Sequence, residues 1–383
     1  MTDVPLGIYV HWPYCAKICP YCDFNVVRDR KQAEQADLAA AILADLEAQR
    51  ALTGPRRLVS VFLGGGTPSL MDPRWAADLV ATARRLWDAA PDLEVSLEAN
   101  PTDAEAGRFS AFAAAGVNRL SLGLQSFDDA ALTFLGRNHD AAEARRAAAL
   151  AAKTFSRLSV DMIYALPGQT LAAWTDQLKA AIDLGAEHVS PYQLTIEAGT
   201  AFDRAVGRGR FKPLDDEAGA ALYDTTQAVL GTAGFEAYEV SNHARGAAAR
   251  SRHNLVYWRG QDYVGVGPGA HGRLTLNGVR TATEAAHRVA DYIVNVGETG
   301  LGFSNPEPLS PVETAEERLL MGLRTYEGVG FGELVALGLT AAHSTVAGLV
   351  EQGLLAADPH RLRATPAGRV VLDGVTRELI LGR

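Results

Sequence analysis

Cysteine is almost absent from this chain. The sequence has three cysteines in 383 residues, and Cys15, Cys19 and Cys22 place all of them within eight positions. An odd number of clustered thiols does not suit the paired framework of a secreted disulfide protein. Thiols gathered in one place, with none elsewhere, fit a reducing compartment. We therefore predict a cytoplasmic protein.

Long apolar runs and an excess of positive charge are also missing. No run approaches the roughly 20 apolar residues of a membrane-spanning helix, and no N-terminal segment has the basic start, apolar centre and cleavage site of a signal peptide. The formal charge is −9, whereas nucleic-acid-binding surfaces are basic. We predict no membrane span and no nucleic-acid partner. Peripheral contact with a membrane is left open.

The three cysteines form the pattern CxxxCxxC. Cysteine thiolates are the usual ligands of iron–sulfur clusters, so three of them can hold three irons of a [4Fe–4S] cube. Because the chain has no fourth cysteine, the fourth iron would be open to a small molecule. A structural zinc site with His11 as fourth ligand is the alternative, but the spacing does not fit the CxxC pairs of zinc fingers.

What the chain does have is an alternation of short β-branched runs and helix-forming segments. Its length favours two domains, and the alternation predicts βαβ units with a parallel sheet. Six repeats are too few for an eight-fold barrel, so we predict an α/β fold, an open (β/α)6 partial TIM barrel. The predicted strands are Leu6–Val10, Leu58–Leu63, Leu93–Leu97, Arg119–Leu124, Leu158–Ile163 and His188–Ile196. The predicted helices include Lys31–Arg50, Pro73–Ala89, Asp103–Ala115, Ala141–Lys153 and Thr170–Leu184.

Polar residues stand at the C-terminal end of each predicted strand, where parallel barrels carry their chemistry. They are His11 with the cysteines, Gly64–Pro68, Glu98–Pro101, Gln125–Ser126, Asp161 with Leu166–Gly168, and Tyr192–Gln193. Glycine has no Cβ and allows a close backbone approach. Alone, the glycine triplet indicates no more than a tight turn. Beside a three-cysteine loop it indicates a seat for a small polar cofactor.

Glu98, Arg137 and Asp161 are candidates for holding that cofactor. The two carboxylates fall in apolar strand contexts, where a buried charge needs a partner, such as an ammonium group or ribose hydroxyls. Arg137 suits a bidentate pair with a carboxylate. The alternative is that the carboxylates are paired internally and Arg137 is solvated. The cysteines favour the functional interpretation.

Together these motifs resemble the radical S-adenosylmethionine (SAM) superfamily. Within it they resemble the oxygen-independent coproporphyrinogen III dehydrogenase family, HemN and its relative HemW. The resemblance spans essentially the whole chain. It rests on CxxxCxxC with Tyr21 before the last cysteine, and on Tyr9–Cys15, Gly64–Pro68, Glu98–Pro101, Gly123–Phe127, Asp161–Gln169 and His253–Trp258.

The resemblance implies a [4Fe–4S] cluster on Cys15, Cys19 and Cys22, with SAM on the open iron through its amino and carboxylate groups. It also implies reductive release of methionine and a 5′-deoxyadenosyl radical, chemistry that the cofactor supplies and the protein positions. The positions that match the family's SAM site are Tyr9, Tyr21, Gly65, Gly66, Thr67, Glu98, Gln125, Arg137 and Asp161.

Two departures from the dehydrogenase favour HemW. The dehydrogenase has a further cysteine where this chain has Phe24, and it has an N-terminal arm, whereas the first strand here is expected near Leu6. The resemblance therefore implies a haem chaperone that delivers haem to respiratory cytochromes, with no coproporphyrinogen dehydrogenase activity. Whether SAM is cleaved is left open. Oxidative decarboxylation of coproporphyrinogen III is the alternative function.

The second half of the chain contains a predicted haem ligand. His253 heads the segment HNLVYW, and a neutral histidine is a common axial ligand of haem. A core histidine is the alternative, and His271 is a weaker candidate for the ligand. Tyr257 and Trp258 would pack against a porphyrin or against the core.

The predicted domains are a barrel at 1–240, a connecting segment at 241–307, and a C-terminal domain of HemN type at 308–383. In the last part, helices at Glu313–Arg324, Gly328–Leu337 and Ala341–Gln352 precede a hairpin of Leu354–Leu355 with Leu362–Thr365, followed by Pro366–Ile380. This order predicts a winged-helix-like α+β domain. Because the chain is acidic, we expect this domain to serve as a cover or partner surface rather than to bind DNA.

Overall fold

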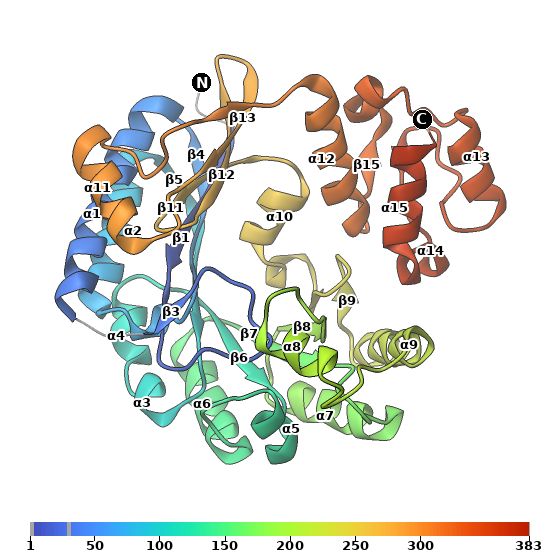
Figure 1. The fold of residues 1–383 in the computed structure, drawn as a ribbon, viewed down its shortest axis with the longest axis horizontal. Coiled ribbons are helices and arrows are strands. Elements are labelled where there is room, and N and C mark those ends of the chain that lie inside the picture. The colour runs from blue at the N-terminus through green and yellow to red at the C-terminus, as the bar shows by residue number, and fades with distance from the viewer. Residues whose placement is uncertain (1–3, 29–31, 383) are drawn as a thin grey trace.

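A curved parallel sheet forms the body of the protein. The computed structural model describes residues 4–28 and 32–382 (Figure 1). Within them, six neighbouring strands run parallel and follow chain order, which confirms the open (β/α)6 barrel. The six strands are β1 (Pro5–Trp12), β4 (Arg57–Gly65), β5 (Asp88–Ala99), β6 (Arg119–Gln125), β7 (Arg157–Tyr164) and β8 (His188–Gln193).

Helices cover the convex face of this sheet, and the loop that carries the cysteines, dark blue in Figure 1, crosses the concave side. Alanine is the best helix former, and its small side chain also allows α6 to pack closely. The buried residues of α6 are Ala144, Ala147, Ala148 and Ala151. The helices that follow the strands are α1 (Gln32–Thr53), α2 (Pro73–Leu86), α3 (Asp103–Ala106), α4 (Phe109–Ala114), α5 (Asp129–Phe134), α6 (Ala141–Thr154), α7 (Leu171–Asp183), α8 (Ala201–Gly207) and α9 (Asp216–Thr232).

One predicted helix of the barrel is shorter than expected, and another is divided in two. The helix expected to reach Ala89 ends at Leu86, because Trp87 turns into extended backbone and its buried indole donates to Thr53 Oγ1 at 3.1 Å. The helix expected over Asp103–Ala115 is divided into α3 and α4 around Arg108, whose guanidinium donates to the carbonyl of Ser69 at 2.8 Å. In both places a tertiary contact overrides a continuous helical pattern.

Both edges of the barrel sheet are extended by later parts of the chain. Beside β1 lies β11 (Asp262–Val266), also parallel, and beside β8 lies antiparallel β10 (His243–Ala244). The stretch predicted to connect two domains therefore adds strands to the barrel sheet, and α11 (Val289–Thr299) packs against α1. The remaining elements of this part are β9 (Glu236–Ala237), a 3₁₀ helix (Ala247–Ala249), α10 (Arg252–Trp258), β12 (His271–Leu276), β13 (Val279–Glu284) and β14 (Glu307–Pro308).

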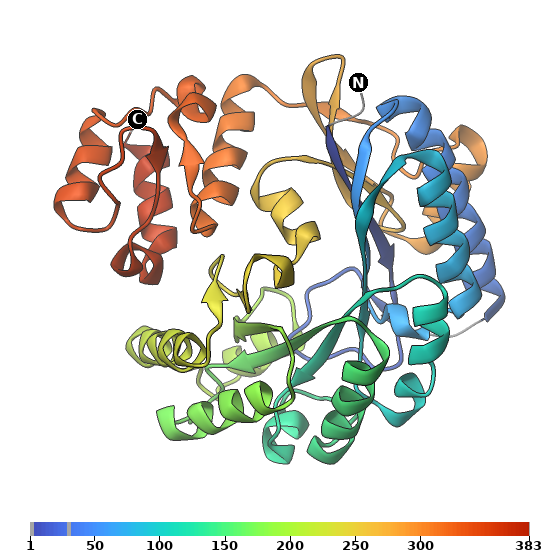
Figure 2. The ribbon, with the colours of Figure 1, turned by 180° about the vertical axis from the view of Figure 1, so that it is seen from behind.

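The C-terminal domain stands beside the barrel and has its own hydrophobic core (Figure 2). Leu355 and Ala364 form the expected bridge, but the strand at Arg361–Leu362 pairs with Val329–Gly330. Its elements are α12 (Pro311–Arg324), β15 (Val329–Gly330), a 3₁₀ helix (Phe331–Leu337), α13 (Ser344–Glu351), β16 (Arg361–Leu362), α14 (Pro366–Val370) and α15 (Leu372–Leu381).

The predicted helix Gly328–Leu337 is wrong at its start. Gly328 has φ +68°, and a Cβ there would lie 2.2 Å from the carbonyl oxygen of Leu362. The chain therefore turns at this glycine and enters β15 before the 3₁₀ helix.

Across the described residues, none of the helices combines the length and the apolar composition that a membrane crossing requires.

Candidate functional site

A cavity of about 430 Å³ opens at the C-terminal ends of the barrel strands. The cysteine loop forms one wall, and residues on β4 to β8 and on the segments that follow these strands form most of the rest. The structure brings together here all the predicted site residues except Tyr9 and His253. What each of them binds stays a prediction.

Cys15, Cys19 and Cys22 all line this cavity. Cys15 ends the short strand β2 (Tyr14–Cys15), which pairs in parallel with β3 (Val27–Arg28). Burial raises the pKa of the Cys15 thiol to about 11 and also raises the pKa of Cys22. Buried thiols of this kind become thiolates when they bind a metal centre. The donor set therefore fits a cluster with one iron left open.

The zinc alternative finds no support in this geometry. His11 Nε2 donates to the carbonyl of Asn25 at 2.8 Å, and Nδ1 accepts from the Tyr9 hydroxyl at 3.0 Å. Both ring nitrogens of the expected fourth ligand are therefore engaged. Among the residues that the structure describes, no three His, Cys, Asp or Glu side chains converge on a single metal ion. A cube takes its ligands on separate irons, so it does not need such convergence.

Neighbouring segments hold the cysteine loop in place. Gly136 has φ +68°, and a Cβ there would lie 2.6 Å from Cδ of Pro20. The backbone N–H of Phe202 donates to the carbonyl of Pro20 at 2.9 Å, and its ring packs 6.3 Å from that of Tyr21. The loop therefore packs against the α5–α6 connection on one side and against α8 on the other.

The glycine triplet lies against this same loop. A Cβ on Gly66 would come within 2.7 Å of the Pro13 carbonyl, and its N–H donates to the Trp12 carbonyl at 2.7 Å. Gly65 has φ +108° and leaves room for the His11 ring. Both glycines also line the cavity. The close backbone approach that these glycines allow is therefore a contact with the cysteine loop. The same turn also borders the predicted cofactor site.

Arg137 joins the cluster loop to the barrel. Its guanidinium donates to Cys19 Sγ at 3.3 Å and to the Gly123 carbonyl at 3.0 Å, and it also contacts Asn100 Oδ1. Thr67 Oγ1 points at Cys15 Sγ across 3.6 Å. Arg137 Nε is buried and has no hydrogen-bond partner among the described residues. An unpaired buried N–H is costly, so this atom suits an incoming carboxylate.

Glu98, Asp161 and Arg119 line the cavity together, and we call this part its floor. Glu98 accepts from the N–H of Gly65 at 3.0 Å, and burial together with Asp161 raises the pKa of Glu98 to about 8. Asp161 accepts from Ser121 Oγ at 3.0 Å, and burial raises its pKa as well. Arg119 lies close enough to favour the charged form of both carboxylates. The floor is therefore an acidic patch suited to a cationic or hydroxyl-bearing ligand.

Sequence reasoning missed part of this site, although a signal was available. Arg119, Ser121, Gly123 and Gln125 occupy alternate positions of β6, and all four line the cavity. Side chains of a strand alternate between its faces. The prediction that Gln125 belongs to the site therefore implied that Arg119, Ser121 and Gly123 face the same side. Gln125 itself has φ +65°, a left-handed conformation that is rare without glycine and that is often found at functional sites.

His253 lies outside the cavity and inside the core. It is 1% exposed, with Nδ1 at 2.9 Å from Ser60 Oγ and Nε2 at 2.7 Å from the Tyr257 hydroxyl. Burial lowers its pKa to about 3, so the ring is neutral. Iron ligation would require one of these two bonds to break. The ligand role of His253 stays a prediction, and this geometry favours the alternative of a core histidine.

Tyr9 is the other predicted residue outside the cavity. Its hydroxyl donates to His11, and its ring stacks 6.2 Å from that of His253. Tyr9 instead borders a second groove, of about 700 Å³, between the barrel edge and α12. His271, Tyr257 and Trp258 also line this groove.

Comparisons with known proteins agree with the fold. Residues 9–180 match the radical SAM superfamily, and residues 309–371 match the HemN C-terminal domain. The fold and the cysteine cavity thus define a radical SAM protein. The chain is 42% identical to the mitochondrial radical S-adenosyl methionine domain-containing protein 1 of Bos taurus, across 98% of this chain and 87% of that protein.

A bacterial relative covers almost the full length. The heme chaperone HemW of Mycobacterium tuberculosis is 36% identical over 99% of this chain and 96% of its own length. The solved structure of the coproporphyrinogen III oxidase HemN of Escherichia coli has the same fold, with a TM-score of 0.81 and 20% identity over 100% of this chain and 91% of that one. The chain belongs to the HemN/HemW family of the radical SAM superfamily. Membership implies SAM and a [4Fe–4S] cluster.

Proposed function

We propose that this protein is a haem chaperone that binds haem and delivers it to respiratory haem proteins, with a SAM-bound [4Fe–4S] cluster in its barrel. The observation that carries the proposal is Phe24. Its side chain is 60% exposed and borders the cysteine cavity, at the position where the dehydrogenase is expected to carry a further cysteine. An apolar ring replaces a thiol at the entrance, which argues against the decarboxylation chemistry and for a binding surface.

The cavity residues have distinct tasks in this proposal. Cys15, Cys19 and Cys22 would hold the cluster, which supplies one electron to bound SAM when the cluster is reduced. Arg137 would bind the SAM carboxylate through its free Nε, since that atom is buried without a partner. Asp161 would accept from the ribose hydroxyls, and Glu98 would lie by the cationic part of SAM.

The proposal also covers domains and location. We place a boundary near residue 308, because a second hydrophobic core begins with α12. Residues 241–307 we assign to the barrel domain, since β11 to β13 continue its sheet. The clustered thiols support a reducing location, and we propose the cytoplasm. The bovine relative is described as mitochondrial.

A transfer assay tests the function. The anaerobically reconstituted protein is loaded with haem, mixed with an apocytochrome, and followed by visible spectroscopy; a parallel reaction with coproporphyrinogen III, SAM and reductant is analysed for decarboxylated product. We expect haem to bind and move to the apocytochrome, with no product in the parallel reaction. Product formation would support the dehydrogenase instead, and failure to bind haem would overturn the proposal.

A further inference from the structure

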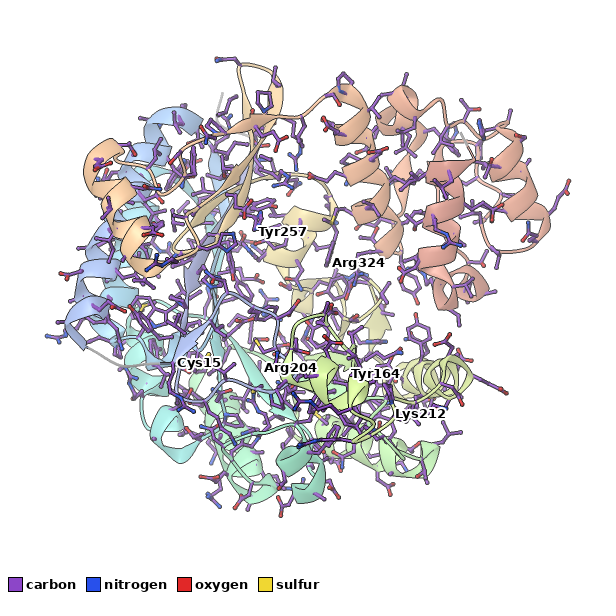
Figure 3. The ribbon with its side chains drawn as sticks, in the orientation of Figure 1. Cys15, Tyr164, Arg204, Lys212, Tyr257 and Arg324 are labelled. Carbon is purple, nitrogen blue, oxygen red and sulfur yellow. The ribbon has the colours of Figure 1, made fainter. Side chains whose placement is uncertain are left out.

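The second groove is assembled along the sheet edge from parts of the chain that are far apart in sequence. One wall is the segment after the cysteines, Asp23–Asn25, and another is the end of α10 with Tyr257 and Trp258. α12 supplies the third wall through Glu317 and Met321. In Figure 3, Tyr257 on α10 and Arg324 on α12 both lie between the barrel and the C-terminal helices, and Cys15 lies lower in the view. The groove therefore exists only where barrel and C-terminal domain meet.

This groove is distinct from the cysteine cavity, although they share a wall. Asp23 and Phe24 border both spaces, whereas none of the three cysteines borders the groove. The wall is fixed by Asn25, whose side-chain amide donates to the carbonyls of Pro268 at 2.9 Å and His287 at 2.8 Å. A ligand in the groove would lie next to the cluster loop without occupying the SAM seat.

The groove has the lining of a site for a flat aromatic ligand. Phe24, Tyr257, Trp258 and Tyr263 contribute rings, and Met321 contributes a thioether. The rings of Tyr257 and Tyr263 meet edge to face with their centroids 4.4 Å apart. The Arg324 guanidinium carbon lies 4.8 Å from the centroid of the Trp258 ring. Rigid aromatic walls with a few polar groups are typical of cofactor pockets, and about 700 Å³ falls in their usual size range.

The polar side of the groove carries arginine. Arg280 borders it and donates to Glu317 at 3.0 Å, and Glu317 also accepts from Arg273 at 2.6 Å. Two cations thus share one acidic partner here, although Arg280 also pairs with Asp262 at 3.4 Å. Such a network is suited to the carboxylate edge of an otherwise apolar ligand.

Two histidines of the groove are exposed; the side chain of His287 is 62% exposed, and His271 is the one whose ring makes no hydrogen bond within the described residues. Its side chain is 56% exposed, and Nε2 is 4.0 Å from Glu284, beyond hydrogen-bond distance. His287 Nε2, by contrast, lies 2.6 Å from Glu284 Oε1. The ring nitrogens of His11 are already engaged. The ring nitrogens of His271 are therefore not engaged in a hydrogen bond within the described residues, and an imidazole nitrogen of this kind is a common axial ligand of haem.

We propose that haem binds in this second groove, with its ring between Phe24, Tyr257 and Met321 and with His271 as the iron ligand. The inference rests on the proposed function and adds the location of its ligand. It also gives the HNLVYW segment a role in the groove that does not require His253 as the iron ligand. That histidine holds Tyr257 in the wall through the 2.7 Å bond to its hydroxyl.

The test is a haem titration of the full-length, anaerobically reconstituted protein, followed by its visible spectrum. The variants are His271→Ala and Met321→Lys, with His360→Ala as the matched control, because His360 is exposed and lies in the C-terminal domain outside the groove. We expect His271→Ala to weaken binding at least about tenfold and to change the Soret band. Met321→Lys should weaken binding by placing a charge in the apolar wall. The control should match the wild type.

The outcomes separate this inference from the proposed function. Wild-type binding that both groove variants leave unchanged would overturn the groove and keep the chaperone. Loss in Met321→Lys with an unchanged spectrum in His271→Ala would overturn His271 as the ligand. If the wild type binds no haem, the chaperone itself is overturned. Thermal unfolding of each variant ensures that a misfolded protein is not counted.

Discussion

The cysteine cavity and the second groove share Asp23 and Phe24 as a wall, yet they are built in different ways. The cavity takes its residues from the ends of successive parallel strands, and most are polar or ionisable. The groove takes aromatic residues, a methionine and histidines from the cluster loop, α10, the sheet edge and α12. A parallel barrel brings its strand ends together whatever the detailed packing, whereas the groove depends on how one domain docks on another. The first site is therefore readable in sequence, and the second is not.

The largest expected effect comes from Cys19→Ser. This change removes one of three thiolates, so the cluster should be lost while the fold, whose cores do not include Cys19, is retained. Iron and sulfide analysis of anaerobically purified protein measures the first, and circular dichroism the second.

The same variant also tests whether the two regions are independent. Haem binding should persist in Cys19→Ser, because the groove does not include the cysteines. Normal iron content would refute the cluster assignment. Loss of haem binding along with the iron would instead show that the shared wall couples the two sites.

His253→Ala should damage the core rather than the haem spectrum. The change leaves a cavity and removes the partners of Ser60 and Tyr257, so we expect a loss of about 2–4 kcal/mol in the free energy of unfolding. Denaturant unfolding measures this loss. Bound haem should keep its wild-type spectrum, in contrast to His271→Ala. A changed spectrum with unaltered stability would return the ligand role to His253.

Glu98 gives the cavity a pH dependence. Its pKa is raised from 4.5 to about 8, so between these values the folded protein keeps a proton that the unfolded chain has lost. Stability of the ligand-free protein should therefore fall as pH rises through this window. Cationic SAM favours the charged carboxylate, so its affinity should increase up to about tenfold per pH unit below pH 8.

Glu98→Gln is the control for that dependence. The variant keeps the shape of the side chain and loses the titration, so SAM affinity should become flat between pH 6 and 8 apart from other groups. Equilibrium binding of SAM at several pH values measures it. Equal slopes in wild type and variant would mean that another group titrates.

The smallest effect is expected for Arg137→Lys. A lysine cannot make the divided contacts of the guanidinium with Cys19 and Gly123. Hydrogen bonds to the sulfurs help set the reduction potential of iron–sulfur clusters, so the potential should become more negative. A redox titration followed by electron paramagnetic resonance measures the shift. An unchanged potential would confine Arg137 to SAM binding.

The partial barrel was predictable because its signals are local and repeated. β-branched runs, helix formers and polar strand ends recur along the first half, and each repeat supports the others. The errors fell where one side chain decides, as when Trp87 ends α2 through its bond to Thr53. The extension of the sheet by β11 was missed. β11 pairs with β1 from more than 200 residues away, and the residues next to β11 in the sequence do not indicate this partner.

The sequence by itself determined the cluster loop, since three cysteines within eight positions must lie together in any fold. It also determined the period-2 face of β6 that lines the cavity. Only the tertiary structure shows how the histidines differ in burial. His253 is withdrawn into the core by Ser60, 193 residues away, while His271 stays exposed at the start of β12. Burial is a property of what packs against a residue, and distant partners are set by the fold rather than by neighbours in the chain.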